Sequence, residues 1–169
     1  VVKRNDKLID ETLAIKEIPG GDGRYGIGIT YSESKSIKTD PKVTVKTEDI
    51  GGPSAGLMFT LELLNQLIDQ DITKGYEIAG TGEMLEDGTV GRIGGIEKKI
   101  VSADKEGIAI FFAPDDEITE AMLEYNPNIE SNYQTAKKTA EKIKTDMKVV
   151  PVKTIDDALD YLETLQPKN

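Results

Sequence analysis

The segment from about Ser54 to Asp69 constrains the fold of this chain most, because it predicts a helix with a single polar face. Four polar side chains recur at the i, i+3, i+4 and i+7 spacing that aligns them on a helix: Glu62, Asn65, Gln66 and Asp69. The other faces carry leucine, methionine, phenylalanine and isoleucine. Other elements must cover such a helix, so we expect it to be mostly buried.

The segments around this helix predict an α/β (α+β) fold, with mixed sheets and packed helices. Short apolar or alternating runs favour strands at about 25–31, 41–47, 76–84, 89–93, 108–112 and 149–152. Asp87-Gly88 predicts a tight hairpin turn. Helical spacing favours helices at about 96–106, 116–125, 130–146 and 155–165. Residues 1–18 predict a β-hairpin that turns at Asn5-Asp6 and whose second strand includes Leu13 and Ile15.

The charge balance narrows the classes of partner. The 169 residues include 21 basic and 31 acidic ones, which gives a net charge of −10. Such a chain repels phosphate backbones, so we expect neither a nucleic-acid partner nor an anionic membrane surface. We interpret the acidic cluster Asp115-Asp116-Glu117 as charges at a helix N-terminus, and we expect no metal and no cofactor. The sequence begins with Val1 rather than methionine, so we expect a piece of a longer protein.

The segment Gly51-Gly52-Pro53-Ser54-Ala55-Gly56 displays a serine on a glycine-rich turn at the start of the buried helix. The sequence contains no histidine and no cysteine. A nucleophilic Ser54 would therefore need a lysine or a carboxylate to take its proton. Free backbone N–H groups at a helix start are suited to stabilise an oxyanion. The alternative interpretation is an ordinary serine N-cap after a turn.

Lys98 and Lys99, in the segment Gly94-Gly95-Ile96-Glu97-Lys98-Lys99, are the candidate bases. Relative to the apolar stripe of Ile96, Ile100 and Ala103, Lys99 lies about 65° from the centre and Lys98 about 165° away, at about 100° per residue. We expect Lys98 in solvent and Lys99 at the edge of the buried face, where desolvation favours the neutral amine of a general base. Alternatively, Lys99 simply extends its aliphatic stem along the helix flank.

Three segments together resemble the signature of Lon-type proteases, peptidase family S16. They are residues 51–56, Thr81-Gly82-Glu83 and residues 94–99, in matching order and spacing. The similarity continues through Ala113-Pro114 to Val150-Pro151-Val152. The resemblance implies the Lon proteolytic-domain fold, related to the ribosomal protein S5 domain 2-like topology, and an endopeptidase that cleaves proteins or peptides with a Ser–Lys dyad. The motif serine falls on Ser54, the motif lysine on Lys99 and the threonine that supports this lysine on Thr81, while Gly52 and Pro53 are expected to support the serine.

One position departs from the family pattern. Many Lon domains carry an acidic residue where this chain has Gly51, although Glu48 and Asp49 lie just upstream. This variant resembles a bacterial subfamily in which a Lon-type domain follows a PDZ domain and an N-terminal membrane anchor. We therefore expect residues 1–23 to be a hairpin and linker from the end of a PDZ domain, and residues 24–169 to be the Lon-type domain. We expect the full-length protein at the extracytoplasmic face of a bacterial membrane.

No Gly-x-x-x-x-Gly-Lys-Ser/Thr loop occurs in the sequence, so we expect this piece to act without ATP hydrolysis. The resemblance also suggests a homo-oligomer. Two alternative functions remain open. A small-molecule kinase-like domain would hold phosphates on residues 51–56, which the negative net charge disfavours and a nucleotide-dependent thermal shift would reveal. A non-catalytic module would instead capture extended peptides at a strand edge.

Overall fold

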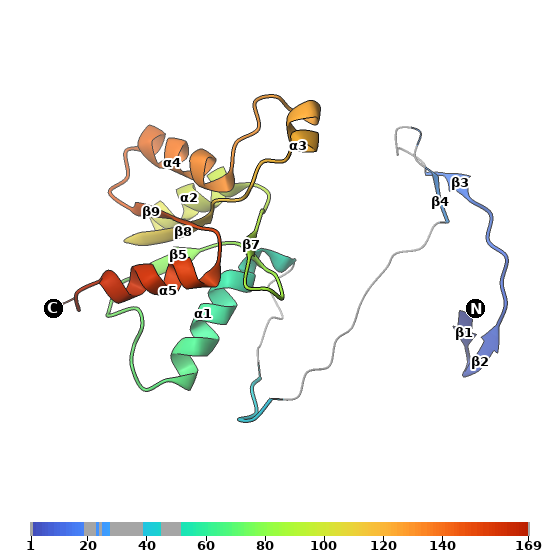
Figure 1. Ribbon diagram of the computed structural model, residues 1–169, viewed down its shortest axis with the longest axis horizontal. Coiled ribbons are helices and arrows are strands. Elements are labelled where there is room, and N and C mark those ends of the chain that lie inside the picture. The colour runs from blue at the N-terminus through green and yellow to red at the C-terminus, as the bar shows by residue number, and fades with distance from the viewer. Residues whose placement is uncertain (1, 19–22, 24, 28–38, 45–51, 169) are drawn as a thin grey trace. The chain divides into compact units, whose positions relative to one another are not determined.

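The computed structural model describes residues 2–18, 23, 25–27, 39–44 and 52–168 (Figure 1). The chain divides into two compact units, Val1–Lys46 and Thr47–Asn169, and each is described by itself. The predicted domain boundary after residue 23 falls within the first unit and stays a prediction. Several predicted features lie outside the described residues: residues 28–31 and 45–47 of two predicted strands, and the positions Glu48, Asp49 and Gly51. Residues 41–44, the described part of the strand predicted at 41–47, lie in no strand.

Two short antiparallel hairpins make up the described strands of the first unit. β1 (Val2–Arg4) pairs with β2 (Lys7–Ile9), and β3 (Lys16–Glu17) pairs with β4 (Tyr25–Gly26). Asn5 and Asp6 form the first turn with φ angles of 50° and 61°, which is typical of the type I′ turns that join hairpins. The predicted hairpin is confirmed, but its second strand ends at Ile9, and Leu13 and Ile15 lie in no strand. Both side chains are exposed, so no packed sheet face accounts for their alternation.

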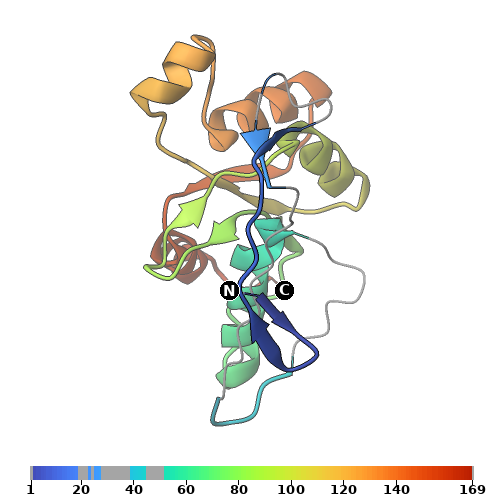
Figure 2. The same cartoon turned by 90° about the vertical axis from the view of Figure 1, so that its right-hand side faces the viewer.

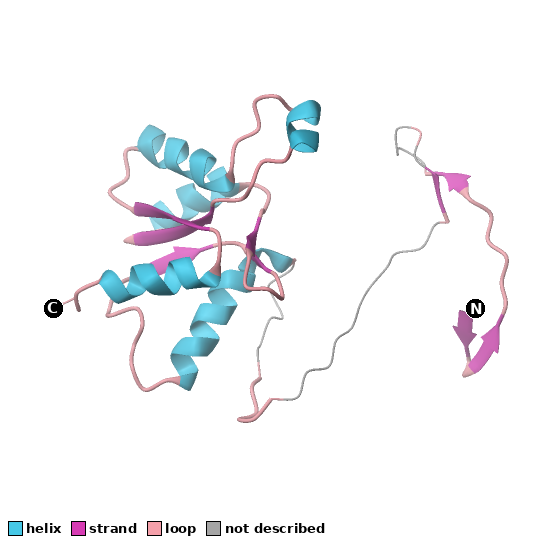
Figure 3. Ribbon diagram, viewed as in Figure 1, coloured by secondary structure: helices cyan, strands magenta, loops and turns pink. Residues whose placement is uncertain are grey.

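A three-stranded parallel sheet organises the second unit (Figure 3). Its strands are β5 (Ile78–Gly80), β8 (Ile110–Pro114) and β9 (Lys148–Val152), in the order β5-β8-β9. Parallel neighbours need crossover connections, which here contain α2 (Ile96–Lys105), and then α3 (Glu120–Tyr125) with α4 (Asn132–Ile143). All five residues of the central strand β8 are buried, as expected for a strand covered on both faces.

Helices cover both faces of this sheet. α1 (Gly56–Leu67) and α5 (Ile155–Thr164) share one hydrophobic cluster with Ile110 and Phe112 of β8, whereas α2 and α4 share a second cluster with Phe111 and Ala113. Figure 1 accordingly shows α1 and α5 on one side of the sheet and α2 and α4 on the other. The predicted mixed α/β class is confirmed, and the predicted helices are present with shifted ends. α1 is less buried than predicted, since its last residue, Leu67, is 49% exposed.

A short hairpin of β6 (Glu83–Met84) and β7 (Val90–Gly91) follows β5 and confirms the predicted turn at Asp87-Gly88. The strand predicted at 76–84 is interrupted at Thr81 and Gly82, because Gly82 adopts a φ of 153°. The hairpin lies beside the start of α5 (Figure 2), where the Val90 N–H donates to the Lys153 carbonyl over 2.7 Å. Within the described ranges, no helix combines the length and apolar character needed to cross a membrane.

Candidate active site

Ser54 lies in the 3-10 helix η1 (Pro53–Ala55), which leads directly into α1. Gly52 precedes it with φ of 80°, a conformation that favours glycine, and Pro53 occupies a first helical position where no N–H is needed. The residues at the N-cap positions of η1 and α1 are Gly52 and Ala55, and neither helix start has a side-chain cap. The alternative interpretation of Ser54 as an N-cap is therefore wrong.

A backbone N–H group lies free beside the serine at this helix start. In a 3-10 helix over Pro53–Ala55, the carbonyl of the N-cap residue Gly52 accepts the first bond and the Pro53 carbonyl accepts the next, from the Gly56 N–H. Pro53 has no N–H, so the Ser54 N–H has no acceptor within the helix. Ser54 itself is half-buried. Its hydroxyl thus lies next to an amide donor that can stabilise a developing negative charge.

The serine turn is fastened to the segment that follows β5. The Ser54 carbonyl accepts hydrogen bonds from the Gly82 N–H over 2.9 Å and from the Thr81 hydroxyl over 2.8 Å. In return, the Leu57 N–H donates to the Gly82 carbonyl over 3.1 Å. The Thr81 N–H donates to the Phe112 carbonyl of β8 over 3.1 Å. The serine is therefore held at the carboxyl end of the parallel sheet.

Two glycines allow this close approach. A Cβ added to Gly56 would lie 2.7 Å from the backbone nitrogen of Met84, so α1 could not start where it does with a larger residue. A Cβ added to Gly82 would lie 2.3 Å from Cγ1 of the buried Val90. The φ of 153° at Gly82 also disfavours any side chain. These contacts explain why both motifs contain glycine at these positions.

The structure brings Thr81 to Ser54, a contact that the sequence analysis did not predict. Thr81 is 1% exposed, and its hydroxyl uses its one hydrogen for the Ser54 carbonyl. The hydroxyl oxygen can still accept a hydrogen bond from an ammonium group. Support of Lys99 by Thr81 therefore stays a prediction, whereas the contact between Thr81 and the serine turn is observed.

The two lysines of α2 face as predicted. Ile96, Ile100 and Ala103 are buried against the sheet, Lys98 is exposed and Lys99 is half-buried. Within the described part of the chain, no hydrogen bond or ion pair engages the Lys99 ammonium, so the structure does not join it to Ser54 or Thr81.

The topology nevertheless places the start of α2 towards the carboxyl end of the sheet, where Ser54 also lies. A short connection joins the end of α2 at Lys105 to the beginning of β8 at Ile110. α2 and β8 are of similar length, about 15 Å each, so the first turn of α2 lies towards the carboxyl end of β8. Lys99 is in this first turn. Ser54 and Lys99 thus both lie towards the carboxyl end of the parallel sheet, although their helices pack on opposite faces of it.

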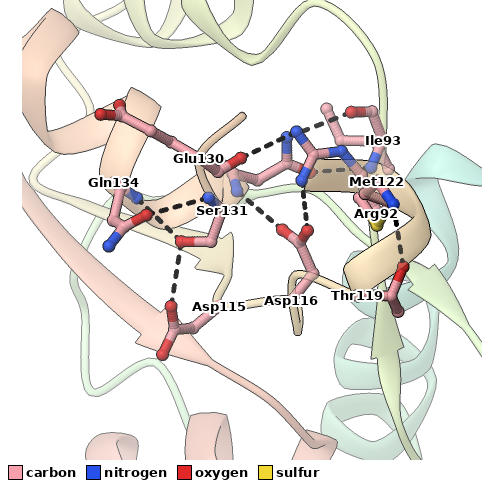
Figure 4. A network of polar contacts seen from close by, with 10 residues as sticks. Arg92, Ile93, Asp115, Asp116, Thr119, Met122, Glu130, Ser131 and Gln134 are labelled. Atoms are coloured by element: carbon pink, nitrogen blue, oxygen red, sulfur yellow. Dashed lines mark hydrogen bonds and ion pairs between the residues drawn. The ribbon is translucent and has the colours of Figure 1, made fainter. Parts of the chain in front are cut away.

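A polar network beside the start of α2 was missed by the sequence analysis (Figure 4). Arg92 forms an ion pair with Asp116 and donates to the Glu130 carbonyl over 2.8 Å. The acidic cluster at 115–117 does not begin its own helix, since α3 starts at Glu120. Asp116 instead accepts a hydrogen bond from the first N–H of α4. A Ser-x-x-Gln capping box at residues 131–134 was the one local signal of this helix start.

The described residues contain no group of three or more His, Cys, Asp or Glu side chains able to hold a metal ion. The candidate site consists of a half-buried serine with a free amide donor and a half-buried lysine in the first turn of α2. Such groups can perform acyl transfer if the lysine is neutral.

Comparison with known proteins matches residues 41–164 to the model of the Lon protease (S16) C-terminal proteolytic domain. The chain belongs to this family. The match includes Ser54, Thr81 and Lys99, and this Lon proteolytic domain has the mixed α/β architecture that the resemblance implied.

Similar proteins are Lon proteases that are much longer than this chain. A Lon protease of Metamycoplasma arthritidis is 28% identical over 89% of this chain and 16% of its own length. One of Campylobacter concisus is 31% identical over 64% of this chain and 11% of its own length. A mitochondrial Lon protease homolog of Neurospora crassa is 36% identical over 49% of this chain and 7% of its own length. The chain thus spans a small fraction of each relative.

Proposed function

We propose that this domain is a serine endopeptidase that cleaves peptide bonds in proteins, with Ser54 as nucleophile and Lys99 as general base. The observation that carries the proposal is the Ser54 turn: Thr81 and Gly82 bind the Ser54 carbonyl, and the Ser54 N–H precedes the first donor of the helix. Membership of the Lon proteolytic-domain family supports the same reaction. The absence of histidine and cysteine from the sequence leaves a lysine or a carboxylate as the base, and the resemblance to the family's signature segments favours the lysine.

In the proposed reaction, the neutral Lys99 amine takes the Ser54 hydroxyl proton as the oxygen attacks the peptide carbonyl carbon. The Ser54 N–H stabilises the resulting oxyanion. Lys99 then returns the proton to the leaving nitrogen, and an acyl-enzyme forms on Ser54. A water molecule, deprotonated by Lys99, attacks this ester, and the released Ser54 oxygen recovers a proton.

Cleavage of an unfolded protein, followed by mass spectrometry, tests the proposal. Ser54→Ala should abolish cleavage, because it removes the attacking oxygen while leaving the backbone bonds of the turn in place. Ser102→Ala is a matched control, since it removes a hydroxyl from the exposed face of α2. Undiminished cleavage by Ser54→Ala would refute the mechanism. Peptide binding without turnover would favour the non-catalytic alternative.

The wider expectations about the full-length protein are also proposals. An upstream PDZ domain, a membrane anchor and an extracytoplasmic location are supported by the subfamily resemblance alone. Light scattering of the purified domain would test the proposed homo-oligomer. Fractionation of cells that produce the full-length protein would test the proposed location.

A further inference from the structure

The side chain of Asn132 forms two hydrogen bonds with the backbone of Ile93, and we call this pair of bonds the clamp. The Ile93 N–H donates to Asn132 Oδ1 over 2.7 Å, and Asn132 Nδ2 donates to the Ile93 carbonyl over 3.1 Å. Asn132 is 3% exposed, so both bonds are shielded from water. The Asn132 amide bonds the N–H and the carbonyl of Ile93, as the backbone of a neighbouring strand would. These buried bonds fix the position of Ile93 more firmly than packing alone.

Ile93 is three residues before the first residue of α2, at the beginning of a turn that has little other support. Gly95 occupies the N-cap position of α2 in a left-handed conformation, with φ of 69°, and no side chain caps the helix. A Cβ added to Gly94 or Gly95 would meet no atom within 4 Å, so neither glycine is packed against a neighbour. The start of α2 therefore depends on the anchored Ile96 side chain and on the segment that precedes it.

The clamp is itself anchored. The Asn132 N–H donates to Asp116 Oδ1 over 2.7 Å, and Arg92, adjacent to Ile93, pairs with Oδ2 of the same carboxylate. Figure 4 shows the Arg92 guanidinium between Asp116 and Glu130. The Arg92 side chain thus binds the loop after β8 and the segment before α4, and the Ile93 backbone binds the first residue of α4.

We propose that Asn132 is a positioning residue for Lys99. It acts through Ile93, whose fixed backbone sets where the first turn of α2 begins and how that turn is rotated. Lys99 lies in this turn, so its amine is directed by the same clamp. The inference rests on the proposed function and deepens it, because it explains how a lysine on one face of the sheet is aimed at a serine on the other. A misplacement of about 1 Å can slow a reaction about 100-fold.

Three variants separate positioning from stability. Asn132→Ala removes both bonds to Ile93. Asn132→Asp keeps an acceptor for the Ile93 N–H, but it places a carboxylate oxygen opposite the Ile93 carbonyl and adds a buried negative charge. Ser131→Ala is the matched control: Ser131 is adjacent, also 3% exposed and caps the same helix, but it bonds Asp115 and Gln134 rather than Ile93.

The first measurement is steady-state cleavage of one peptide well below the unfolding temperature. Asn132→Ala should lower kcat about 10- to 100-fold with little change in KM, Asn132→Asp should lower it at least as much, and Ser131→Ala should stay within about threefold of the parent. An equal loss of kcat in Ser131→Ala and Asn132→Ala would overturn the positioning role, and so would an unchanged kcat in Asn132→Ala.

The second measurement does not require cleavage. Amine acetylation, read by mass spectrometry, gives the labelling ratio of Lys99 to its exposed neighbour Lys98, and hydrogen exchange reports on the Ile93 amide. Asn132→Ala should change the ratio and accelerate the exchange, whereas Ser131→Ala should change neither. A parent chain without Ser54-dependent cleavage would refute the proposed function, and the labelling ratio would then decide this inference: an unchanged ratio in Asn132→Ala overturns it.

Discussion

Thr81→Val tests whether the hydroxyl that holds the serine turn is needed for catalysis. Thr81 is 1% exposed and donates to the Ser54 carbonyl over 2.8 Å. Valine has the same shape, so no cavity forms. The Ser54 carbonyl keeps its second partner, the Gly82 N–H at 2.9 Å, so no buried acceptor is left unpaired. The cost should therefore be that of one hydrogen bond, about 0.5–1.5 kcal/mol.

Thr81→Ser is the matched variant, because it keeps the hydroxyl and loses the methyl group. Removal of one buried methyl costs about 0.8 kcal/mol in transfer free energy, slightly more if a small cavity remains. The two variants should thus unfold at similar urea concentrations. Only Thr81→Val loses the bond to the serine turn and the oxygen that could accept from the Lys99 ammonium.

Initial cleavage rates at matched folded fractions decide between them. Thr81→Val should be slowed about tenfold or more, whereas Thr81→Ser should stay within about threefold of the parent. Equal rates for the parent and Thr81→Val would show that Thr81 is an ordinary core residue. Equal slowing in both variants would show that packing matters here and the hydroxyl does not.

Three further outcomes are expected. Gly82→Ala should destabilise the fold by about 2–5 kcal/mol in urea unfolding, because it combines an unfavourable φ with a clash against Val90. Lys99→Arg should be inactive in cleavage assays, since a guanidinium cannot accept a proton, whereas the exposed Lys98→Ala should retain activity. Burial raises the pKa of Asp157, but hydrogen bonds from backbone N–H groups at the start of α5 outweigh it, and the folded pKa lies below its usual value. This carboxylate should therefore stabilise the fold above about pH 4 and lose that effect as pH falls through the lower folded value, so Asp157→Asn should flatten the acid limb of stability measured against pH.

Local patterns in the sequence were enough to predict α2 and the orientation of its lysines. The apolar spacing of Ile96, Ile100 and Ala103 needs only the helical period, and these three residues are buried in the structure. The interruption of the strand at Thr81 and Gly82 could not be predicted in this way, because both residues bond the Ser54 carbonyl, which is 27 residues before Thr81 in the chain.

Long-range polar contacts were missed for the same reason. Asn132 bonds Ile93 across 39 residues, and Arg92 bonds Asp116 across 24. An asparagine or arginine that bonds a segment far away in the chain belongs to no helical or strand periodicity. Its partner is also not near it in the sequence. The candidate nucleophile and base could therefore be predicted, while the residues that hold their surroundings in place could not.

The sheet separates the two residues of the candidate dyad. Ser54 begins the layer of α1 and α5, whereas Lys99 belongs to the layer of α2 and α4, and each layer has its own hydrophobic cluster. The distance between Ser54 and Lys99 thus depends on how both layers of helices pack on the sheet, and not on the conformation of one loop. We therefore expect a distant change such as Leu162→Ala, in the first cluster, to alter the distance between Ser54 and Lys99 without a contact to either residue. A substrate that contacts both residues would link the two layers of helices. Its binding should therefore slow hydrogen exchange in both layers.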